Sequence, residues 1–299
     1  MTESAIVIAV SSARCRLFLD GREVDCLVPS EIARRQRSAL AVGDRVIAEA
    51  ADGALYRLVE ILPRTTVLSR PDPMNPRVER LIAANIDLAI NVVSVKSPPL
   101  RPRLIDRFLI AIQRGGAQAA ICVNKIDLAE DRTAALEPLR VYEELGAPVV
   151  ACSTKTGEGL DSLRALIENR TCAFVGHSGV GKSSLLNALD ARLKLATGGL
   201  QKRGTGRHTT SAATLFDLGD NTVVIDTPGI REFGLWDISR ESLREAFPEF
   251  QEAAEWCRFN DCTHTHEPEC EVKKRVERGQ ISPARYETYV RLANEISGS

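Results

Sequence analysis

The sequence lacks both a long apolar run and an excess of charge of either sign. The first twenty residues have no basic start followed by an apolar stretch, and the run Ile6-Val7-Ile8-Ala9-Val10 is too short to cross a bilayer. The 39 basic and 40 acidic residues leave a net charge of −1, so a nucleic-acid partner would have to be met by local patches. These absences argue against a membrane partner and predict a cytoplasmic protein.

The cysteines show no disulfide framework. Five of the eight are scattered along the chain, several of them in apolar, strand-like runs typical of reduced, buried thiols: Cys15, Cys26, Cys122, Cys152 and Cys172. Only the last three cysteines of the chain, Cys257, Cys262 and Cys270, lie close together in the sequence. With 299 residues, of which 44% are apolar, the chain can bury a sizeable core, and its length allows two or three domains.

Short alternating segments at the start of the chain predict five β-strands. The expected strands are Ala5–Val10, Arg14–Leu19, Arg22–Val28, Asp44–Glu49 and Leu55–Ile61. Five short strands separated by turn signals suggest an OB-type barrel over residues 1–71, a fold that often holds oligonucleotides. Arg34, Arg35 and Arg37 are expected in a loop that either meets RNA phosphates or is simply solvated.

The proline-rich stretch Arg70–Pro76 predicts a linker, with a domain boundary near residue 72. Apolar runs then alternate with helical stretches to residue 237, which predicts a mostly parallel sheet covered by helices. The expected strands are Leu88–Val95, Ala119–Val123, Val149–Cys152, Cys172–Val175 and Thr222–Ile225, and the expected helices are Arg103–Arg114, Ala135–Leu145, Leu160–Ile167 and Lys182–Asp190. The third region, 238–299, is charged and helical. We therefore expect a multi-domain α/β protein.

A glycine-rich loop with P-loop spacing lies between an apolar strand and a helix. Val175 ends the strand, and the loop comprises Gly176, His177, Ser178, Gly179, Val180, Gly181, Lys182 and Ser183. The glycines let the backbone approach phosphates, and the main-chain amides and the helix N-terminus supply donors. Lys182 is expected to bridge the β and γ phosphates, and Ser183 to bind Mg²⁺.

The tetrad Asn124-Lys125-Ile126-Asp127 after another apolar strand predicts guanine as the base. The Asp127 carboxylate can accept both the ring imino and the exocyclic amino protons of guanine, a donor pair that adenine lacks, and a buried carboxylate left unpaired is costly. Lys125 is expected to pack along the base, and Ser153 to contact its edge. The tetrad precedes the P-loop, the reverse of the order in ordinary GTPases, so the chain is predicted to be a rearranged GTPase.

Two further stretches are candidates for sensing the γ phosphate. Asp226, at the end of a strand, can reach Mg²⁺ through water, and the amide of Gly229 can contact the phosphate. In the glycine-rich stretch Gly204–Thr210, either Thr209 or Thr210 is expected to supply a hydroxyl to Mg²⁺.

The position after Asp226-Thr227-Pro228-Gly229 lacks the glutamine that orients the attacking water in many GTPases, because Ile230 and Arg231 follow. Intrinsic turnover is therefore expected to be slow. His208 is a candidate substitute for the glutamine, or else a histidine that faces solvent or RNA.

Cys257, Cys262, His264 and Cys270 supply three thiolates and one imidazole, which matches a closed, structural Zn²⁺ site. His266 competes for the fourth place. The basic residues that follow form a helical face that is either solvated or able to meet RNA phosphates: Lys273, Lys274, Arg275 and Arg278.

These motifs together resemble the ribosome small-subunit-dependent GTPase family, RsgA or YjeQ. The resemblance rests on the OB-like front, the permuted motif order, the P-loop, Arg207-His208-Thr209-Thr210, Asp226-Thr227-Pro228-Gly229 and the Cys-Cys-His-Cys cluster. It implies a circularly permuted GTPase that binds the 30S subunit late in assembly, contacts 16S rRNA through its flanking domains, and hydrolyses GTP to GDP faster when bound. We also expect a monomer.

Two other functions stay open: a GTPase of this build that acts on another RNA or a protein, and a non-catalytic RNA-binding module that holds nucleotide structurally. A P-loop kinase or ATPase is weaker, because Asn124 and Asp127 would then have no role. Because the chain runs from Gly229 almost directly into the zinc region, we further expect γ-phosphate binding to reposition that region through this short link.

Overall fold

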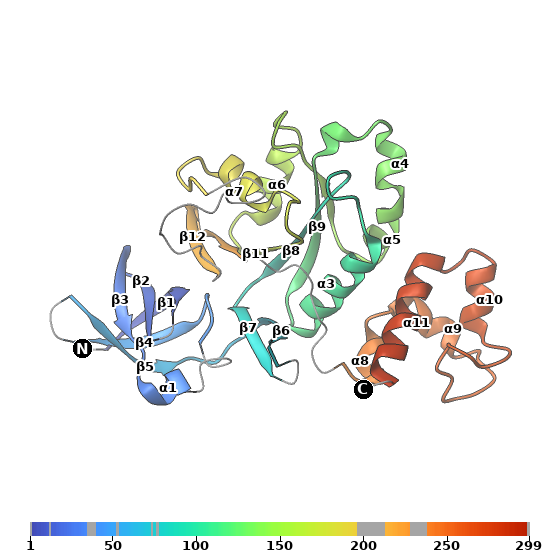
Figure 1. Ribbon diagram of the computed structural model, residues 1–299, viewed down its shortest axis with the longest axis horizontal. Coiled ribbons are helices and arrows are strands. Elements are labelled where there is room, and N and C mark those ends of the chain that lie inside the picture. The colour runs from blue at the N-terminus through green and yellow to red at the C-terminus, as the bar shows by residue number, and fades with distance from the viewer. Residues whose placement is uncertain are drawn as a thin grey trace.

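The computed structural model describes residues 2–11, 13–34, 40–51, 54–72, 74–75, 78–195, 213–227 and 238–297. Figure 1 shows three regions side by side: a β-barrel in blue, a central α/β domain in green and yellow, and a helical region in orange and red. The multi-domain α/β architecture predicted from the sequence is therefore confirmed. No helix in these ranges has the length and apolar character needed to cross a membrane.

The N-terminal region is a closed five-stranded barrel. Its strands are β1 (Thr2–Val10), β2 (Arg14–Leu19), β3 (Arg22–Leu27), β4 (Arg45–Ala50) and β5 (Tyr56–Ile61). They pair in the order β1-β2-β3-β5-β4, and β4 closes on β1. Alternate apolar side chains fill the interior, as the period-two pattern predicts. The short helix α1 (Ser30–Arg34) follows β3. This arrangement confirms the OB-type barrel.

The predicted linker differs from the structure. β6 (Val67–Pro71) and β7 (Glu79–Ala84) form an antiparallel hairpin, and the amide of Asp72 donates to the carbonyl of Val78 over 2.8 Å. Proline is tolerated at the end of a strand, so Pro71 does not prevent the pairing. The hairpin lies between the barrel and the central domain in Figure 1.

The central domain contains a six-stranded sheet with the order β10-β9-β8-β11-β13-β12. The strands are β8 (Leu88–Ser94), β9 (Gln118–Asn124), β10 (Val149–Ala151), β11 (Thr171–Val175), β12 (Thr214–Gly219) and β13 (Thr222–Asp226). The first five in the sheet order are parallel, whereas β12 is antiparallel to β13. Our sequence analysis did not include β12, which also meets the barrel where Thr214 pairs with Ala9.

Helices cover both faces of this sheet. α6 (Leu160–Ile167) and α7 (Lys182–Leu189) pack on one face, and α3 (Pro102–Arg114) packs on the other. The helix expected over Ala135–Leu145 is divided into α4 (Arg132–Leu136), η2 (Glu137–Leu139) and α5 (Arg140–Glu144). Pro138 explains the interruption, because it has no amide proton for the helical ladder.

The C-terminal region is helical, as predicted, and packs against α3 on the side away from the barrel (Figure 1). Its elements are α8 (Arg240–Glu245), η3 (Pro248–Phe250), α9 (Gln251–Ala254), α10 (Glu271–Glu277) and α11 (Pro283–Ser297). Its apolar core combines Phe247, Phe250 and Tyr289 with Ile110 from α3.

Candidate nucleotide and metal sites

The P-loop connects β11 to α7 at the carboxyl edge of the parallel sheet. Gly176 and Gly181 have φ values of 147° and 98°, which other residues rarely adopt. A Cβ at Gly176 would lie 2.2 Å from the carbonyl oxygen of Val92, and one at Gly181 would lie 2.3 Å from Nδ2 of Asn124. These glycines are therefore required by backbone conformation and by the close approach of neighbouring strand ends.

Lys182 and Asp226 lie together at this edge because β11 and β13 are neighbours. Lys182 begins α7, and its Nζ donates to the carbonyl of Gly176 over 2.7 Å. Burial lowers the pKa of Lys182, and nearby Asp226 opposes that effect. Burial likewise raises the pKa of Asp226, opposed by the charge of Lys182. The two charged groups therefore partly offset each other at this edge of the sheet.

This end of the sheet offers suitable ligands for a divalent cation. Oδ1 of Asp226 is buried and has no hydrogen-bond partner among the described residues. Ser183 follows Lys182 in the first turn of α7, and Thr227 is committed elsewhere, since its hydroxyl donates to the Phe174 carbonyl over 2.7 Å. A free carboxylate oxygen and a hydroxyl fit the oxygen ligands and bound waters that Mg²⁺ prefers. His208, Thr209, Thr210 and Gly229 lie outside the described residues.

The tetrad of residues 124–127 is hydrogen-bonded directly to the P-loop. Asn124 is buried at the end of β9, and its Nδ2 donates to the carbonyl of Val180 over 2.9 Å. Its Oδ1 accepts the amide of Lys125 over 2.8 Å. The amide of Ile126 donates to the main-chain carbonyl of Cys152, and this bond fixes the tetrad against the end of β10. Asn124 therefore ties together two loops that are far apart in the sequence.

Lys125 and Asp127 complete this edge. Lys125 has a φ of 61°, and its Nζ donates to the carbonyls of Gly179, over 2.7 Å, and of Ser97. Ser153 is buried, and its hydroxyl donates to Oδ1 of Asp127 over 2.6 Å. One carboxylate oxygen of Asp127 is thus oriented by Ser153, so the two residues expected to read the base lie in contact.

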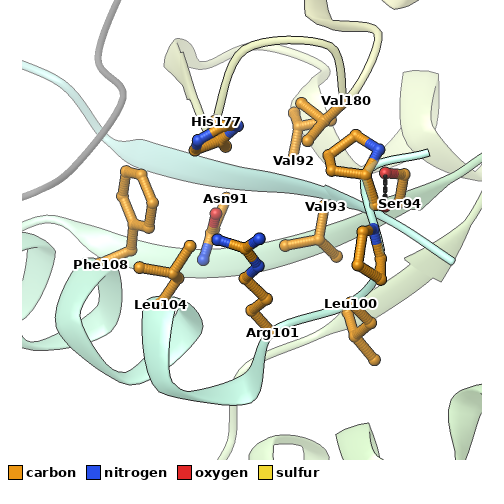
Figure 2. Close-up of a pocket in the computed structure, with 12 residues that line it drawn as sticks. Asn91, Val92, Val93, Ser94, Leu100, Arg101, Leu104, Phe108, His177 and Val180 are labelled. Atoms are coloured by element: carbon orange, nitrogen blue, oxygen red, sulfur yellow. Dashed lines mark hydrogen bonds between the residues drawn. The ribbon is translucent and has the colours of Figure 1, made fainter. Parts of the chain in front are cut away.

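A small cavity lies beside the P-loop, between β8 and the start of α3 (Figure 2). Its volume is about 30 Å³, and His177 and Val180 of the P-loop line it together with Leu104 and Phe108 of α3. Asn91 of β8 also lines the cavity and is fully buried. Neither Nδ2 nor Oδ1 of its side chain has a hydrogen-bond partner among the described residues. Sequence reasoning missed Asn91, because a single polar residue within an apolar strand carries no positional signal.

The predicted metal ligands converge in the C-terminal region. One ligand atom from each of Cys257, Cys262, His264 and Cys270 lies within 4.8 Å of every other. Nδ1 of His264 is 3.6 Å from Sγ of Cys257 and 3.5 Å from Sγ of Cys270, and those two sulfurs are 3.9 Å apart. Tetrahedral Zn²⁺ with bonds of about 2.3 Å to sulfur and about 2.0 Å to nitrogen requires similar ligand separations. The donor set and its spacing therefore fit Zn²⁺.

His266 is not part of this cluster. Its Nδ1 lies 3.0 Å from the hydroxyl of Thr265, and its side chain is exposed. The carbonyl of His264 accepts a hydrogen bond from Tyr286 over 2.8 Å, so the aromatic core holds the ligand loop. The structure therefore groups His264, and not His266, with the three thiols.

The basic face expected on α10 is largely paired with acidic groups. Lys274 and Arg278 contact Glu271 at 4.0 and 3.1 Å, and Arg275 contacts Glu252 at 3.0 Å. Lys273 donates to a main-chain carbonyl. Glu271 and Glu252 thus offset part, but not all, of the positive charge of this face.

The chain matches known proteins over most of its length. The family model described as RsgA GTPase matches residues 61–236. A protein of Gemmatimonas aurantiaca named "Small ribosomal subunit biogenesis GTPase RsgA" is 44% identical over 87% of this chain and 85% of its own length. A Chlorobaculum parvum protein with the same name is 41% identical over 93% of this chain and 92% of its own length.

Solved structures show the same architecture. YjeQ from Thermotoga maritima superposes with a TM-score of 0.76 and 32% identity, and the match covers all of both chains. YloQ, described as a circularly permuted GTPase, gives a TM-score of 0.70 and 29% identity over all of this chain and 96% of its own.

Proposed function

The chain belongs to the RsgA GTPase family, and from this premise we propose that it hydrolyses GTP to GDP while bound to the 30S ribosomal subunit, late in the assembly of that particle. The observation that carries the proposal is the hydrogen bond between Asn124 and Val180, which joins a guanine-reading loop to a phosphate-binding loop. Names of the relatives supply the ribosomal context. Action in the cytoplasm and as a monomer stays a prediction.

The geometry of the two loops supports the nucleotide-binding roles proposed for their residues. Asp127, oriented by Ser153, is positioned to accept the two guanine protons. Lys125 spans from the tetrad to Gly179, where its aliphatic part can lie along the base. Lys182 can exchange its bond to the Gly176 carbonyl for the β and γ phosphates. The amides of residues 176–181 supply the remaining phosphate donors.

Ser183 and Asp226 are the proposed Mg²⁺-binding groups among the described residues, Asp226 acting through bound water. The cation would neutralise charge that develops on the phosphates during transfer. Thr209 or Thr210, Gly229 and His208 stay predicted for the hydroxyl ligand, the γ-phosphate contact and the positioning of water. Slow intrinsic turnover is expected, because Ile230 stands where many GTPases carry the water-orienting glutamine.

The Cys257, Cys262, His264 and Cys270 cluster is proposed to hold one structural Zn²⁺. Four protein ligands complete a tetrahedron, which leaves no open position for a substrate. The metal would cross-link the loops between α9 and α10, where there is little regular secondary structure.

The outer face of the barrel is the proposed contact with 16S rRNA. Arg14, Leu27 and Arg57 are paired neighbours across β2, β3 and β5, and all three are exposed. Two arginines beside an apolar side chain suit phosphates and an unstacked base, and OB folds commonly use this face. The side chains of Arg34, Arg35 and Arg37 lie outside the described residues, so their predicted role is not tested.

Steady-state GTP hydrolysis with and without purified 30S subunits tests the proposal. We expect turnover to rise with 30S subunits and not with 50S subunits, which serve as the matched ribosomal control. Stimulation by a different RNA or protein alone would support the alternative GTPase function, and nucleotide binding without any phosphate release would support a non-catalytic module.

A further inference from the structure

One face of α3 forms the contact between the central domain and the C-terminal region (Figure 1). Arg103, Asp106, Arg107 and Ile110 follow the spacing i, i+3, i+4, i+7 and therefore share that face. Ile110 is buried in the C-terminal core. Arg103 and Arg107 make ion pairs of 2.5 and 3.0 Å with α11 at the exposed edge of the contact. α3 is thus part of both regions.

A buried guanidinium stands at the centre of this contact. Arg285 of α11 is 3% exposed, and its Nη1 donates to Oδ1 of Asp106, itself 1% exposed, over 2.8 Å. Its Nε donates to Glu249 over 2.7 Å, and its Nη2 donates to the carbonyl of Ala246 over 3.2 Å. Its Cζ lies 4.2 Å from the ring centroid of Phe247. These contacts fix Arg285 in one orientation.

The charges of this network depend on one another. Two carboxylates, Asp106 and Glu249, share one guanidinium, and Oδ2 of Asp106 has no hydrogen-bond partner among the described residues. Without Arg285, neither carboxylate would have an opposite charge in contact among the described residues, a strongly unfavourable state for buried acidic groups. Separation of the two regions at this point is therefore resisted by electrostatics as well as by packing.

The same network reaches the start of α3. The hydroxyl of Tyr142 lies 2.8 Å from Oδ1 of Asp106 and 3.1 Å from the carbonyl of Pro102, the first residue of the helix. Pro102 is one helical turn before Asp106, roughly 6 Å along the axis. Movement at Asp106 must therefore move the beginning of α3 and the loop, residues 95–101, that leads into it.

That loop contacts the nucleotide site. Its Ser97 carbonyl accepts a hydrogen bond from Lys125, which also donates to Gly179 of the P-loop over 2.7 Å. The hydroxyl of Ser94 holds the loop by donating to the carbonyl of Pro98 over 2.7 Å. Lys125, which is expected to bind the guanine base, thus bridges the loop before α3 and the P-loop.

Packing between α3 and the P-loop is incomplete at the same place. The cavity in Figure 2 lies between His177 and the α3 residues Leu104 and Phe108, and the Asn91 amide that lines it has no hydrogen-bond partner in the part of the chain that the structure describes. The start of α3 therefore does not pack tightly against the P-loop. Besides apolar packing of α3 against the sheet, its position depends on the bond from Lys125 to the preceding loop and on the Asp106–Arg285 network.

We propose that Asp106 and Arg285 are positioning residues that couple the C-terminal region to the nucleotide site through α3. Docking of the C-terminal region on a partner shifts α3, and the loop before α3 then alters the setting of Lys125 against the P-loop. The inference rests on the proposed function for the identity of the partner, the 30S subunit. This route is separate from the chain link after Thr227, through which we also expect coupling.

The test uses the full chain with Arg285→Met, Asp106→Asn and the control Arg103→Ala, which removes an exposed ion pair on the same helix face. We expect basal kcat and GDP affinity to stay within about twofold of wild type in all three, because strand ends hold the pocket. Stimulation by 30S subunits should fall about tenfold in the first two and persist in the control. Arg285→Lys, which keeps the positive charge, should restore part of the stimulation by 30S subunits.

A second measurement does not depend on the ribosome: hydrogen exchange of α3 and α11 in the GTP-analogue and GDP complexes. We expect a nucleotide-dependent difference in wild type that disappears in Asp106→Asn, which preserves side-chain shape should Arg285→Met fail to fold. Folded variants with wild-type metal content that retain this difference would overturn the coupling. Absence of 30S stimulation in wild type would instead reject the proposed function, and the exchange result would still decide the coupling.

Discussion

The nucleotide pocket and the metal-binding region both hold polar side chains in fixed positions, but they do so by different means. In the pocket, the ends of β9, β11 and β13 place Asn124, Gly176 and Asp226 at one edge of a buried sheet. In the C-terminal region, the ligands come from irregular segments between short helices. A large apolar sheet can position a site without its ligand, whereas short loops need a metal to cross-link them. We therefore expect ligand removal to affect the two regions very differently.

The largest expected effect is the loss of the metal. A chelator, or His264→Ala, should unfold the loops between α9 and α10, because structural Zn²⁺ contributes on the order of 10 kcal/mol in small domains. Circular dichroism and metal analysis would measure the loss, while a fluorescent GDP analogue should still bind. The matched control is His266→Ala, which removes an exposed histidine outside the cluster. Equal unfolding of both variants would contradict the assignment.

Lys182→Ala tests the opposite behaviour, a loss of activity without a loss of structure. Removing a preorganised positive group from the phosphate site should lower kcat by about 10²–10³-fold. Thermal melting should change little, since among the described residues the Lys182 side chain gives up one hydrogen bond, that to the Gly176 carbonyl. Lys274→Ala on α10 provides a control lysine. Retained turnover in Lys182→Ala would rule out this loop as the phosphate site.

Asp127→Asn should change which nucleotide the pocket prefers and should not abolish nucleotide binding. Xanthine carries a carbonyl where guanine carries its exocyclic amine, so an asparagine amide can pair with it. We expect the preference for GTP over xanthosine triphosphate to fall by about 10–100-fold, the value of one unsatisfied buried polar contact. Competition binding with the two nucleotides measures it, and an unchanged preference would contradict the role of Asp127.

Gly181→Ala examines how tightly the two loops of the pocket are joined. Its φ of 98° costs another residue about 1–2 kcal/mol, and the new Cβ would also displace the Asn124 amide. Gly146→Ala is the control, because its φ is 84° but nothing lies within 4 Å of a Cβ there. Chemical denaturation should show the greater loss for Gly181→Ala, together with weaker nucleotide binding. Equal losses would show that the Asn124 contact adds nothing.

The smallest effect is expected on the barrel. Arg57→Ala should reduce the slope of log affinity for 30S subunits against log salt by about 0.7–0.9, the contribution of one phosphate contact. Arg164→Ala, an exposed arginine of α6 paired with Asp161, is the control. Binding titrations at several salt concentrations make the comparison. Identical slopes for Arg57→Ala and wild type would move the RNA contact away from this face.

Several elements could be read directly from the sequence because their causes are local. β2 and α6 begin and end at the predicted residues, since alternation and helical periodicity define them without distant partners. The hairpin of β6 and β7 stands where prolines predict a linker, and Pro138 divides the single helix predicted over Ala135–Leu145. β12 is half-exposed and so lacks the continuous apolar run that marks a buried strand in the sequence.

By itself, the sequence determined the chemistry that is available: a P-loop, a carboxylate for guanine, and three thiols with one imidazole for a metal. These depend on residue types at short spacings, which a one-dimensional pattern preserves. The tertiary structure shows that Asn124 ties the two nucleotide loops together, that Glu252 of α9 pairs with Arg275 of α10, and that Arg285 meets Asp106 from 179 positions away. Such pairs form because separate elements bury their apolar faces against one another, and no local pattern records which elements will meet.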